Sequence, residues 1–486
     1  MKNWRINIVF TFIVLFGAAI IGRLIYLQIF QYDYYMALAQ GQNSQINVSD
    51  EVRGTIYFSG GQTLASSVRD NEGNFIRKYP QGEMASQVVG FLGGEGAGQY
   101  GLEGFYNEVL RPKEVIQTQY FFSFNYGAGA GQDIYLTLDF NIQYEAEQLL
   151  ARAKKDFDIK SGSIVVLEPS TGKILAMAIL PGFDPNKYSQ VKDFSIFQNP
   201  IIQSFYEPGS VLKAVTMASA LDQGKVTPQT TYVDTGILKI GGSTIYNYNK
   251  HIWGQKTMTE VLENSINTGA VFAERKVGND VFMEYLRRFG LFEPTRVDLQ
   301  GEVYSENKEL KKGREISYVT ASFGQGIEIT PLQMARAFAV IANGGKLVKP
   351  YIVEKIVDGG KTAETKPEIS KSNVILPKTA SDLTEMLISV VRNGFAQTAK
   401  VKGYDVAGKT GTSQVPYTAI GISKKGYSDQ TWQSFVGFAP AFSPRFLILV
   451  KLDNPKADTS EYSAAPIFGK LAEYIINYME IPPDHE

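Results

Sequence analysis

The stretch SIVVLEPSTGKILAM at residues 163–177 decides the fold of the larger part of the chain. Two apolar runs rich in β-branched residues, 163–167 and 174–180, flank a Pro-Ser-Thr-Gly turn, which predicts an antiparallel hairpin. Two more strands are expected late in the chain, at residues 434–439 and 445–452. Helices are expected at residues 211–223, 259–264, 280–289, 331–343, 380–393 and 465–479. This order predicts an α+β domain in which the first and last strands pair in one sheet.

The composition excludes several classes of protein. The chain has 486 residues and a net charge of −1, which argues against binding nucleic acid through its phosphates. Without cysteine, it has no disulfide, no thiolate nucleophile and no cysteine-ligated metal. Of the two histidines, His485 is penultimate, and His251, beside Trp253, is interpreted as a structural loop residue. If the chain transfers an acyl group, a lysine or a carboxylate is therefore the expected base.

The amino-terminal end predicts a membrane anchor. Lys2 and Arg5 precede an apolar run at residues 6–22, and the helix is expected to continue to residue 28, a length that can span a bilayer. The positive charges ahead of the run place residues 1–5 in the cytoplasm and the remaining chain outside. The small residues at 17–19 leave a cleaved signal peptide as the alternative, but the apolar residues that follow favour a retained anchor.

Two domains are expected outside the membrane, at residues 43–158 and 159–480. The first is rich in glycine and aromatic residues, and it ends in an expected strand at 133–138 and an amphipathic helix at 141–157. Four of its aromatic side chains either pack inside the domain or contact a partner: Tyr120, Phe121, Phe122 and Phe124.

The segment YEPGSVLK at residues 206–213 carries the first chemical motif. Pro-Gly ends a loop, and Ser210 then begins an apolar helix, so Ser210 and Lys213 share one helical face. A hydroxyl needs an adjacent base to act as a nucleophile, and a lysine can serve if its pKa is lowered by burial or by a nearby cation. The backbone N–H groups at a helix start could also bind an oxyanion. The Ser-x-x-Lys pattern is weak evidence alone, because it occurs three more times in the chain.

Two later motifs strengthen this interpretation. Ser265-Ile266-Asn267 follows the helix expected to end near residue 264, and Thr268-Gly269 is expected to break the helical pattern there. Lys409-Thr410-Gly411 is the only Lys-Thr-Gly sequence, and the alternation over residues 404–412 suits an edge strand bordering a cleft.

Residues 403–410 also satisfy the phosphate-loop pattern G-x-x-x-x-G-K-[ST]. A phosphate loop must open a helix. Gly411, Pro416 and Gly421 follow here and disfavour one, so the nucleotide-binding interpretation is set aside.

Taken together, the three motifs form the set found in penicillin-binding proteins and serine β-lactamases. The chain resembles a class B penicillin-binding protein, a monofunctional D,D-transpeptidase of bacterial wall synthesis. Further segments carry the resemblance, at residues 163–177, 181–186, 322–326, 330–335, 342–345 and 435–440, together with Arg53-Gly54 and Gly101-Leu102-Glu103 ahead of them. Residues 53–61 lack the family's usual Asp-Arg-Asn-Gly-like run, and residues 393–398 depart from its Gly-Thr-Gly-Thr-like turn.

The resemblance implies a role for each motif residue. Ser210 would be the nucleophile and Lys213 its general base. Ser265 would carry protons, and Asn267 would orient Lys213 and the substrate. Lys409 would assist Ser265 and keep Lys213 neutral. The substrate and oxyanion contacts would come from Thr410, Gly411 and Thr412, with the backbone N–H groups of Ser210 and Thr412 forming the oxyanion hole. No cofactor and no metal is implied.

The resemblance further implies a transpeptidase-like antiparallel sheet flanked by helices, behind an anchor helix and an elongated pedestal domain. The expected activity is peptidoglycan cross-linking through a serine acyl-enzyme in the bacterial cytoplasmic membrane, with the catalytic domain outside. The expected partners are stem peptides, β-lactam inhibitors, the membrane, a glycosyltransferase polymerase and other wall-synthesis proteins, and not nucleic acid. A β-lactamase or β-lactam sensor and a non-catalytic scaffold remain the alternatives.

Overall fold

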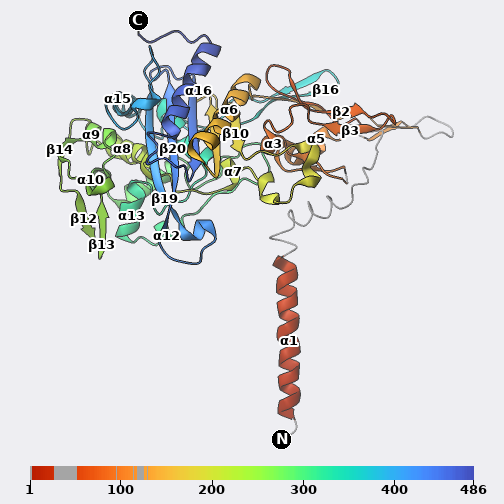
Figure 1. The fold of residues 1–486 in the computed structure, drawn as a ribbon, viewed down its shortest axis with the longest axis horizontal. Coiled ribbons are helices and arrows are strands. Elements are labelled where there is room, and N and C mark those ends of the chain that lie inside the picture. The colour runs from red at the N-terminus through yellow and green to blue at the C-terminus, as the bar shows by residue number, and fades with distance from the viewer. Residues whose placement is uncertain are drawn as a thin grey trace.

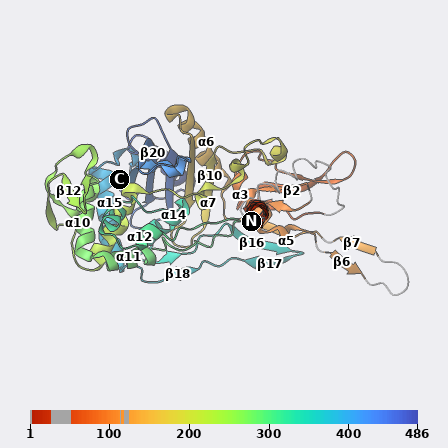
Figure 2. The same cartoon turned by 90° about the horizontal axis from the view of Figure 1, so that it is seen from below.

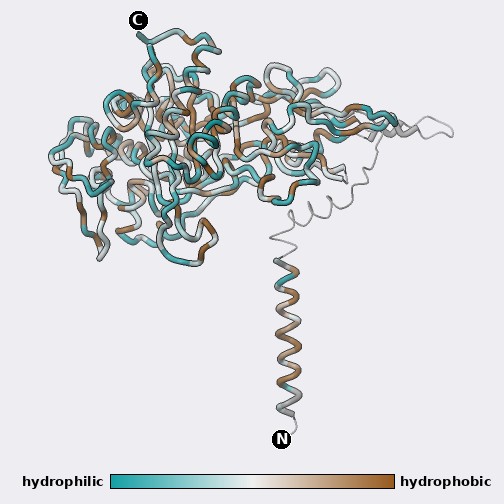
Figure 3. The backbone as a smooth tube through the Cα atoms, viewed as in Figure 1, coloured by the Kyte–Doolittle hydropathy of each residue, from teal (hydrophilic) through white to brown (hydrophobic). Residues whose placement is uncertain are grey.

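The computed structural model describes residues 3–26, 52–94, 96–112, 114–117, 125–128 and 130–485. Helix α1 (Asn3–Ile25) stands apart from the rest of the described chain (Figure 1). Its segment Asn7–Leu24 has a mean hydropathy of 2.0 and no buried residue, and brown colour runs along it in Figure 3. An apolar helix of this length can cross a bilayer. Residues 27 and 28 of the predicted anchor lie outside the described residues, as do the aromatic residues 120–122 and 124.

The elements that precede residue 161 are mostly short. They are β1 (Ile56–Tyr57), β2 (Thr63–Arg69), β3 (Phe75–Lys78), α3 (Ser86–Val89), β4 (Phe91–Leu92), β5 (Gly98–Gln99), α4 (Gly101–Phe105), α5 (Asn107–Leu110), β6 (Glu114–Gln117), β7 (Asn125–Ala128), β8 (Asp133–Leu136) and α6 (Phe140–Phe157). The predicted strand at 133–138 and helix at 141–157 correspond to β8 and α6.

The remaining elements are a mixture of helices and strands. They are β9 (Ser161–Leu167), β10 (Ile174–Leu180), η2 (Pro185–Gln190), η3 (Phe194–Phe197), α7 (Pro200–Gln203), η4 (Gly209–Leu212), α8 (Lys213–Asp222), β11 (Thr231–Asp234), β12 (Ile237–Ile240), β13 (Ser243–Tyr246), η5 (Tyr248–Lys250), β14 (Gly254–Thr257), α9 (Met258–Glu263), α10 (Asn267–Val277), α11 (Asn279–Arg288), α12 (Lys308–Lys311), α13 (Glu315–Ser322), α14 (Pro331–Ala342), β15 (Leu347–Val348), β16 (Val353–Asp358), β17 (Lys361–Glu364), β18 (Ile369–Lys371), α15 (Pro377–Asn393), η6 (Gln397–Ala399), β19 (Ala407–Pro416), η7 (Tyr417–Ile420), β20 (Tyr427–Ala439), β21 (Phe446–Asp453) and α16 (Ala464–Tyr478).

An antiparallel sheet of five strands, in the order β10-β9-β21-β20-β19, forms the centre of the larger part. The first strand, β9, pairs with the last, β21, which confirms the predicted pairing. Phe435 on β20 packs against Phe468 of α16, whereas Phe438 packs against Phe338 of α14. Residues three apart on a strand point to opposite faces, so helices cover the sheet on both sides (Figure 2). Double coverage explains why β9 and β21 read as continuous apolar runs.

A second sheet, in the order β17-β16-β8-β1-β2-β3, lies on the side of the first domain (Figure 1). Its strands β16 and β17 come from residues that the sequence placed in the second domain. Conversely, α6 packs on β10, β9 and α16 of the five-stranded sheet, although the sequence placed it in the first domain. Its buried residues, among them Ile142, Ala146, Leu149 and Ala153, recur at helical spacing and need an apolar partner surface. The domain limits at 158 and 159 stay a prediction.

Candidate active site

The segment that carries Ser210 is a 3₁₀ turn, η4, which runs directly into α8. Ser210 therefore lies one turn before Lys213, as predicted. The turn is held by the loop after α13, because the Gly209 N–H donates to the carbonyl oxygen of Gly324 at 3.0 Å. A Cβ atom on Gly324 would lie 2.0 Å from the Gly209 oxygen, and the φ of Gly324 is +82°, so only glycine fits this backbone-to-backbone contact.

Lys213, the first residue of α8, is buried, with 1% of the residue exposed. Its Nζ donates to Asn267 Oδ1 at 2.8 Å and to the carbonyl oxygen of Ser265, and it lies 3.3 Å from Ser265 Oγ. Burial lowers the pKa of Lys213 well below its ordinary value, and the charge of Lys409 lowers it further. The amine therefore loses its proton more readily than an exposed lysine does, as a general base must.

Ser265 and Asn267 occupy the connection between α9 and α10. The prediction that Thr268-Gly269 breaks the helical pattern is wrong, because α10 begins at Asn267 and contains both residues. Gly269 lies where α10 packs against Val261 of α9. A Cβ atom at this position would lie 2.5 Å from a Val261 methyl group, so the contact between the two helices requires glycine. Ser265 itself has a φ of +51°, a strained conformation for a residue with a side chain. Such strain persists where packing fixes a side chain in a functional position.

The amine of Lys409 reaches the same serine from β19. Its Nζ donates to Ser265 Oγ at 3.0 Å and to the Thr410 carbonyl oxygen at 3.2 Å. Lys409 is fully buried, and burial lowers its pKa to about 7. β19 is the edge strand of the sheet, as predicted. The strand continues through Thr410 to Pro416, so Thr410 does not open a helix and the strand-to-helix turn of a phosphate loop is not formed at 403–410.

β19, which carries Lys409, lies close against the turn that carries Ser210. A Cβ on Gly411 would lie 2.6 Å from the Pro208 carbonyl oxygen and 2.7 Å from a Val211 methyl group. Glycine at this position therefore lets the strand lie against η4. The Thr412 hydroxyl is held by hydrogen bonds with the Oγ and N–H of Ser460 at 3.1 Å.

A cavity of about 550 Å³ opens over this cluster. Its lining includes five predicted site residues: Ser210, Ser265, Asn267, Thr410 and Thr412. Lys213 and Lys409 are not part of this lining but donate hydrogen bonds to Ser265, which is. His251 is exposed, with its ring 4.3 Å from that of Trp253, and neither residue lines this cavity. The arrangement joins one accessible hydroxyl, a second hydroxyl and two amines with lowered pKa values, which is suited to nucleophilic catalysis without histidine.

Glu207, which was not identified from the sequence, connects the Ser210 turn to the strands β19 and β20 through hydrogen bonds. Its carboxylate accepts a hydrogen bond from the Tyr427 hydroxyl on β20 at 3.1 Å, and its carbonyl oxygen accepts one from Ser413 Oγ on β19 at 2.7 Å. Burial raises the pKa of Glu207 to about 7, although the Gly326 N–H and Tyr427 act in the opposite direction. The partners lie about two hundred positions later in the chain, so no local pattern could have identified them.

Replacing Glu207 by glutamine is expected to stabilise the protein more at pH 8 than at pH 5. The pKa of Glu207 is about 7 in the folded protein and 4.5 ordinarily. The free energy of unfolding of the wild type therefore falls as pH rises through this interval, by at most about 3 kcal/mol. Glutamine keeps the shape and an acceptor for Tyr427 but carries no charge. The melting temperatures of both proteins at the two pH values measure the effect, with the exposed Glu364→Gln as control. A difference between Glu207→Gln and wild type that is independent of pH would contradict the assigned protonation.

Comparison with known proteins yields two family matches. Residues 162–473 match the penicillin-binding protein transpeptidase domain, and residues 53–123 match the penicillin-binding protein A dimerisation domain. Penicillin-binding protein PbpB of Mycolicibacterium smegmatis is 34% identical over 84% of this chain and 65% of its own length. A probable peptidoglycan D,D-transpeptidase, PbpC of Pseudomonas aeruginosa, is 30% identical over 85% of this chain and 72% of its own length.

A similar solved structure is that of penicillin-binding protein 3 from Mycobacterium tuberculosis in complex with aztreonam. It has a TM-score of 0.79 and 30% sequence identity, and the match covers 90% of this chain and 98% of that one. The chain spans 62–65% of the length of the first curated relatives that it matches.

Proposed function

Since the chain belongs to the class B penicillin-binding proteins, we propose that it is a serine D,D-transpeptidase that cross-links peptidoglycan stem peptides. The observation that carries the proposal is the continuous contact from Lys213 Nζ through Ser265 Oγ to Lys409 Nζ, with separations of 3.3 and 3.0 Å, beneath a cavity that Ser210 lines. A hydroxyl nucleophile, a base and a proton carrier are the groups that acyl transfer requires.

In the acylation step, Ser210 Oγ attacks the carbonyl carbon of the peptide bond between the last two D-alanine residues of a stem peptide. Lys213 Nζ accepts the hydroxyl proton. The oxyanion of the tetrahedral intermediate is bound by the backbone N–H groups of Ser210 and Thr412. When the peptide bond breaks, the leaving D-alanine nitrogen takes a proton delivered through Ser265, which leaves an ester on Ser210.

In the second step, an amine of a neighbouring stem peptide attacks that ester. The amine loses a proton, Ser210 recovers one, and the new peptide bond joins the two stems. The energy of the broken peptide bond is conserved in the ester, so no nucleotide is consumed. Thr410 would hold the carboxylate of the donor peptide, and Asn267 would orient Lys213, because its Oδ1 accepts from the amine while its Nδ2 donates to the Tyr246 carbonyl oxygen at 2.9 Å.

The apolar helix α1 supports a proposed location for the chain. We place it in the bacterial cytoplasmic membrane as a single span, with residues 43–158 as a pedestal and residues 159–480 as the catalytic domain outside. A chain that only cross-links needs glycan strands made by another enzyme. The proposed partners are therefore a membrane glycosyltransferase polymerase and other wall-synthesis proteins. β-Lactams, which resemble the donor peptide, would acylate Ser210.

The test uses the full chain in detergent, a fluorescent penicillin, and a synthetic stem pentapeptide with a free acceptor amine. We expect a covalent adduct that persists for hours, that maps by mass spectrometry to the peptide containing Ser210, and that is accompanied by release of D-alanine from the pentapeptide. Rapid loss of the adduct with release of opened penicillin would identify a β-lactamase instead. If neither an adduct nor release of D-alanine is observed, the protein is a non-catalytic scaffold and the proposal is wrong.

A further inference from the structure

A buried carboxylate that the proposed mechanism does not use lies at the end of β11. Asp234 is 2% exposed, and each of its two oxygens accepts two hydrogen bonds. Oδ1 accepts from the Thr268 hydroxyl at 2.6 Å and from the Gly236 N–H at 3.0 Å. Oδ2 accepts from the Trp253 N–H at 2.8 Å and from Asn247 Nδ2 at 2.9 Å. A carboxylate has about four acceptor positions, so those of Asp234 are all occupied.

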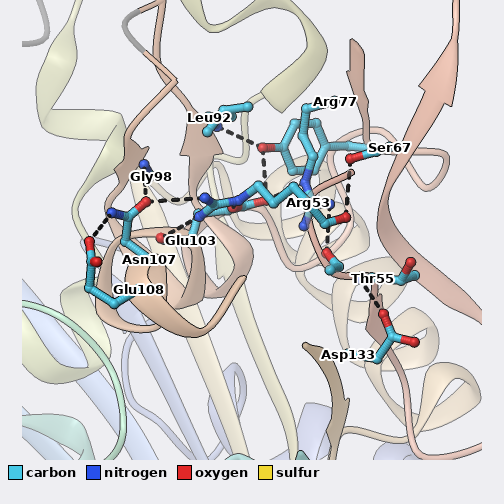
Figure 4. Close-up of polar contacts among 12 residues, drawn as sticks. Arg53, Thr55, Ser67, Arg77, Leu92, Gly98, Glu103, Asn107, Glu108 and Asp133 are labelled. Atoms are coloured by element: carbon cyan, nitrogen blue, oxygen red, sulfur yellow. Dashed lines mark hydrogen bonds and ion pairs between the residues drawn. The ribbon is translucent and has the colours of Figure 1, made fainter. Parts of the chain in front are cut away.

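The charge of Asp234 is stabilised without a cation. Burial acts to raise its pKa, but the four hydrogen bonds, that of Thr268 first, outweigh burial and hold the pKa below its ordinary value. No lysine, arginine or histidine pairs with Asp234 in the part of the chain that the structure describes. The buried Glu103 of the pedestal differs, because it accepts from Arg53 Nε at 2.7 Å and from Arg77 Nε at 2.6 Å (Figure 4). The ionised state of Asp234 therefore depends on where its four neutral donors are placed.

Two of the four donors belong to residues next to the contacts of Asn267. Thr268 follows Asn267 in α10. Asn267 Nδ2 donates to the Tyr246 carbonyl oxygen at 2.9 Å, and Asn247 follows Tyr246 in the chain. Asp234 thus fixes the residue after Asn267 and also the residue after the partner of Asn267.

The first turn of α10 also depends on these contacts. The residue before the helix, Ile266, provides no side-chain cap. The Thr268 N–H, which a helix start leaves without a partner in the helix, donates instead to Asn247 Oδ1 at 3.2 Å. The negative charge of Asp234 beside this turn interacts favourably with the positive end of the helix dipole. Asn247 and Asp234 therefore supply from outside the helix what its own sequence lacks.

We propose that Asp234 is a positioning residue for the acyl transfer at Ser210. Through the contacts above, it holds Asn267 in the orientation in which its Oδ1 accepts from Lys213 Nζ at 2.8 Å. Asp234 does not line the cavity over Ser210, so it acts through Asn267 and not on the substrate. A small displacement of a group that orients the base is enough to slow the reaction. This inference rests on the proposed function.

The test measures the rate constant of acylation by a fluorescent penicillin, with the full chain in detergent under single-turnover conditions. Asp234→Asn keeps the size of the side chain but turns two N–H donors towards groups that are themselves donors. We expect acylation to be about tenfold slower. The matched control is Asp298→Asn, because the Asp298 carboxylate accepts from the N–H groups of Ile352 and Val353 at 2.7 and 2.8 Å and contacts no residue of the cavity. Both variants should lower the melting temperature, but Asp298→Asn should acylate at the wild-type rate.

The decisive comparison repeats the change in an Asn267→Ala background. Since Asp234 acts through the Asn267 amide, Asp234→Asn should slow acylation less than twofold once that amide is absent, whereas a general loss of structure would slow both backgrounds equally. Thr268→Val removes one of the four donors without adding a group to the carboxylate. It should give a smaller slowing that is also lost in the Asn267→Ala background, and it serves as the test if Asp234→Asn does not fold.

The outcomes separate this inference from the proposed function. Equal slowing by Asp234→Asn with and without the Asn267 amide would overturn the positioning role, and so would wild-type rates in folded Asp234→Asn and Thr268→Val. In either case the proposed function would stand, because the wild type is acylated. A wild-type protein that forms no adduct would contradict the proposed function and the positioning role together.

Discussion

Replacing Lys213 by methionine is expected to slow the acylation of Ser210 by a β-lactam by about 10³-fold or more. Lys213 is fully buried, and its amine contacts Ser265 and Asn267 rather than solvent, so water is not positioned to replace it as a base. Methionine preserves the length and apolar stem of the side chain, which limits the effect on folding. The rate constant of acylation, measured with a fluorescent penicillin under single-turnover conditions, gives the loss directly.

Ser210→Ala should abolish the adduct. The double variant Ser210→Ala/Lys213→Met should show the same loss of acylation as Ser210→Ala alone, because the two groups act as one unit. The chain offers a matched control in Ser305 and Lys308, which have the same spacing but lie in a charged segment, where Lys308 is the first residue of α12. Ser305→Ala and Lys308→Met should acylate at the wild-type rate. If Lys213→Met kept more than a tenth of that rate while remaining folded, the assignment of Lys213 as the base would be wrong.

The parts of the fold that the sequence predicted are those set by local pattern. The hairpin of β9 and β10, the late strands and the edge strand carrying Lys409 follow from apolar runs and turns, and their order implied that β9 and β21 pair. The start of α10 was missed because Gly269 reads locally as a helix breaker. Only its contact with Val261 explains why glycine is tolerated there.

Long-range contacts set what the sequence could not predict. β16 and β17 leave the second domain and extend the sheet of the first, a pairing between segments more than two hundred residues apart that has no local signal. The contact between Lys409 and Ser265 joins residues 144 positions apart. It was expected only because of the family resemblance. Glu207 is only three residues before Ser210 in the sequence, yet its role is visible only in the folded chain, where Tyr427 and Ser413 donate hydrogen bonds to it.

Replacing Lys409 by methionine is expected to slow acylation on the order of 100-fold at pH 7 and to change its pH dependence. In the wild type, the rate should rise with pH as Lys213 loses its proton, and fall again above about pH 7 as Lys409 loses its own. The charge of Lys409 is one cause of the lowered pKa of Lys213. Without that charge, the pKa of Lys213 rises, so the ascending limb moves to higher pH and the descending limb disappears.

The variant Lys409→Arg distinguishes the effect of the positive charge at this position from the effect of losing a proton there. A guanidinium group stays protonated throughout the accessible range, so the descending limb should again disappear, whereas the ascending limb should stay at its wild-type position. Measuring acylation rate constants from pH 5 to 9 for the three proteins distinguishes the effects. An ascending limb at the same pH in Lys409→Met and in wild type would mean that burial alone keeps Lys213 neutral, and that Lys409 acts only through its hydrogen bond to Ser265.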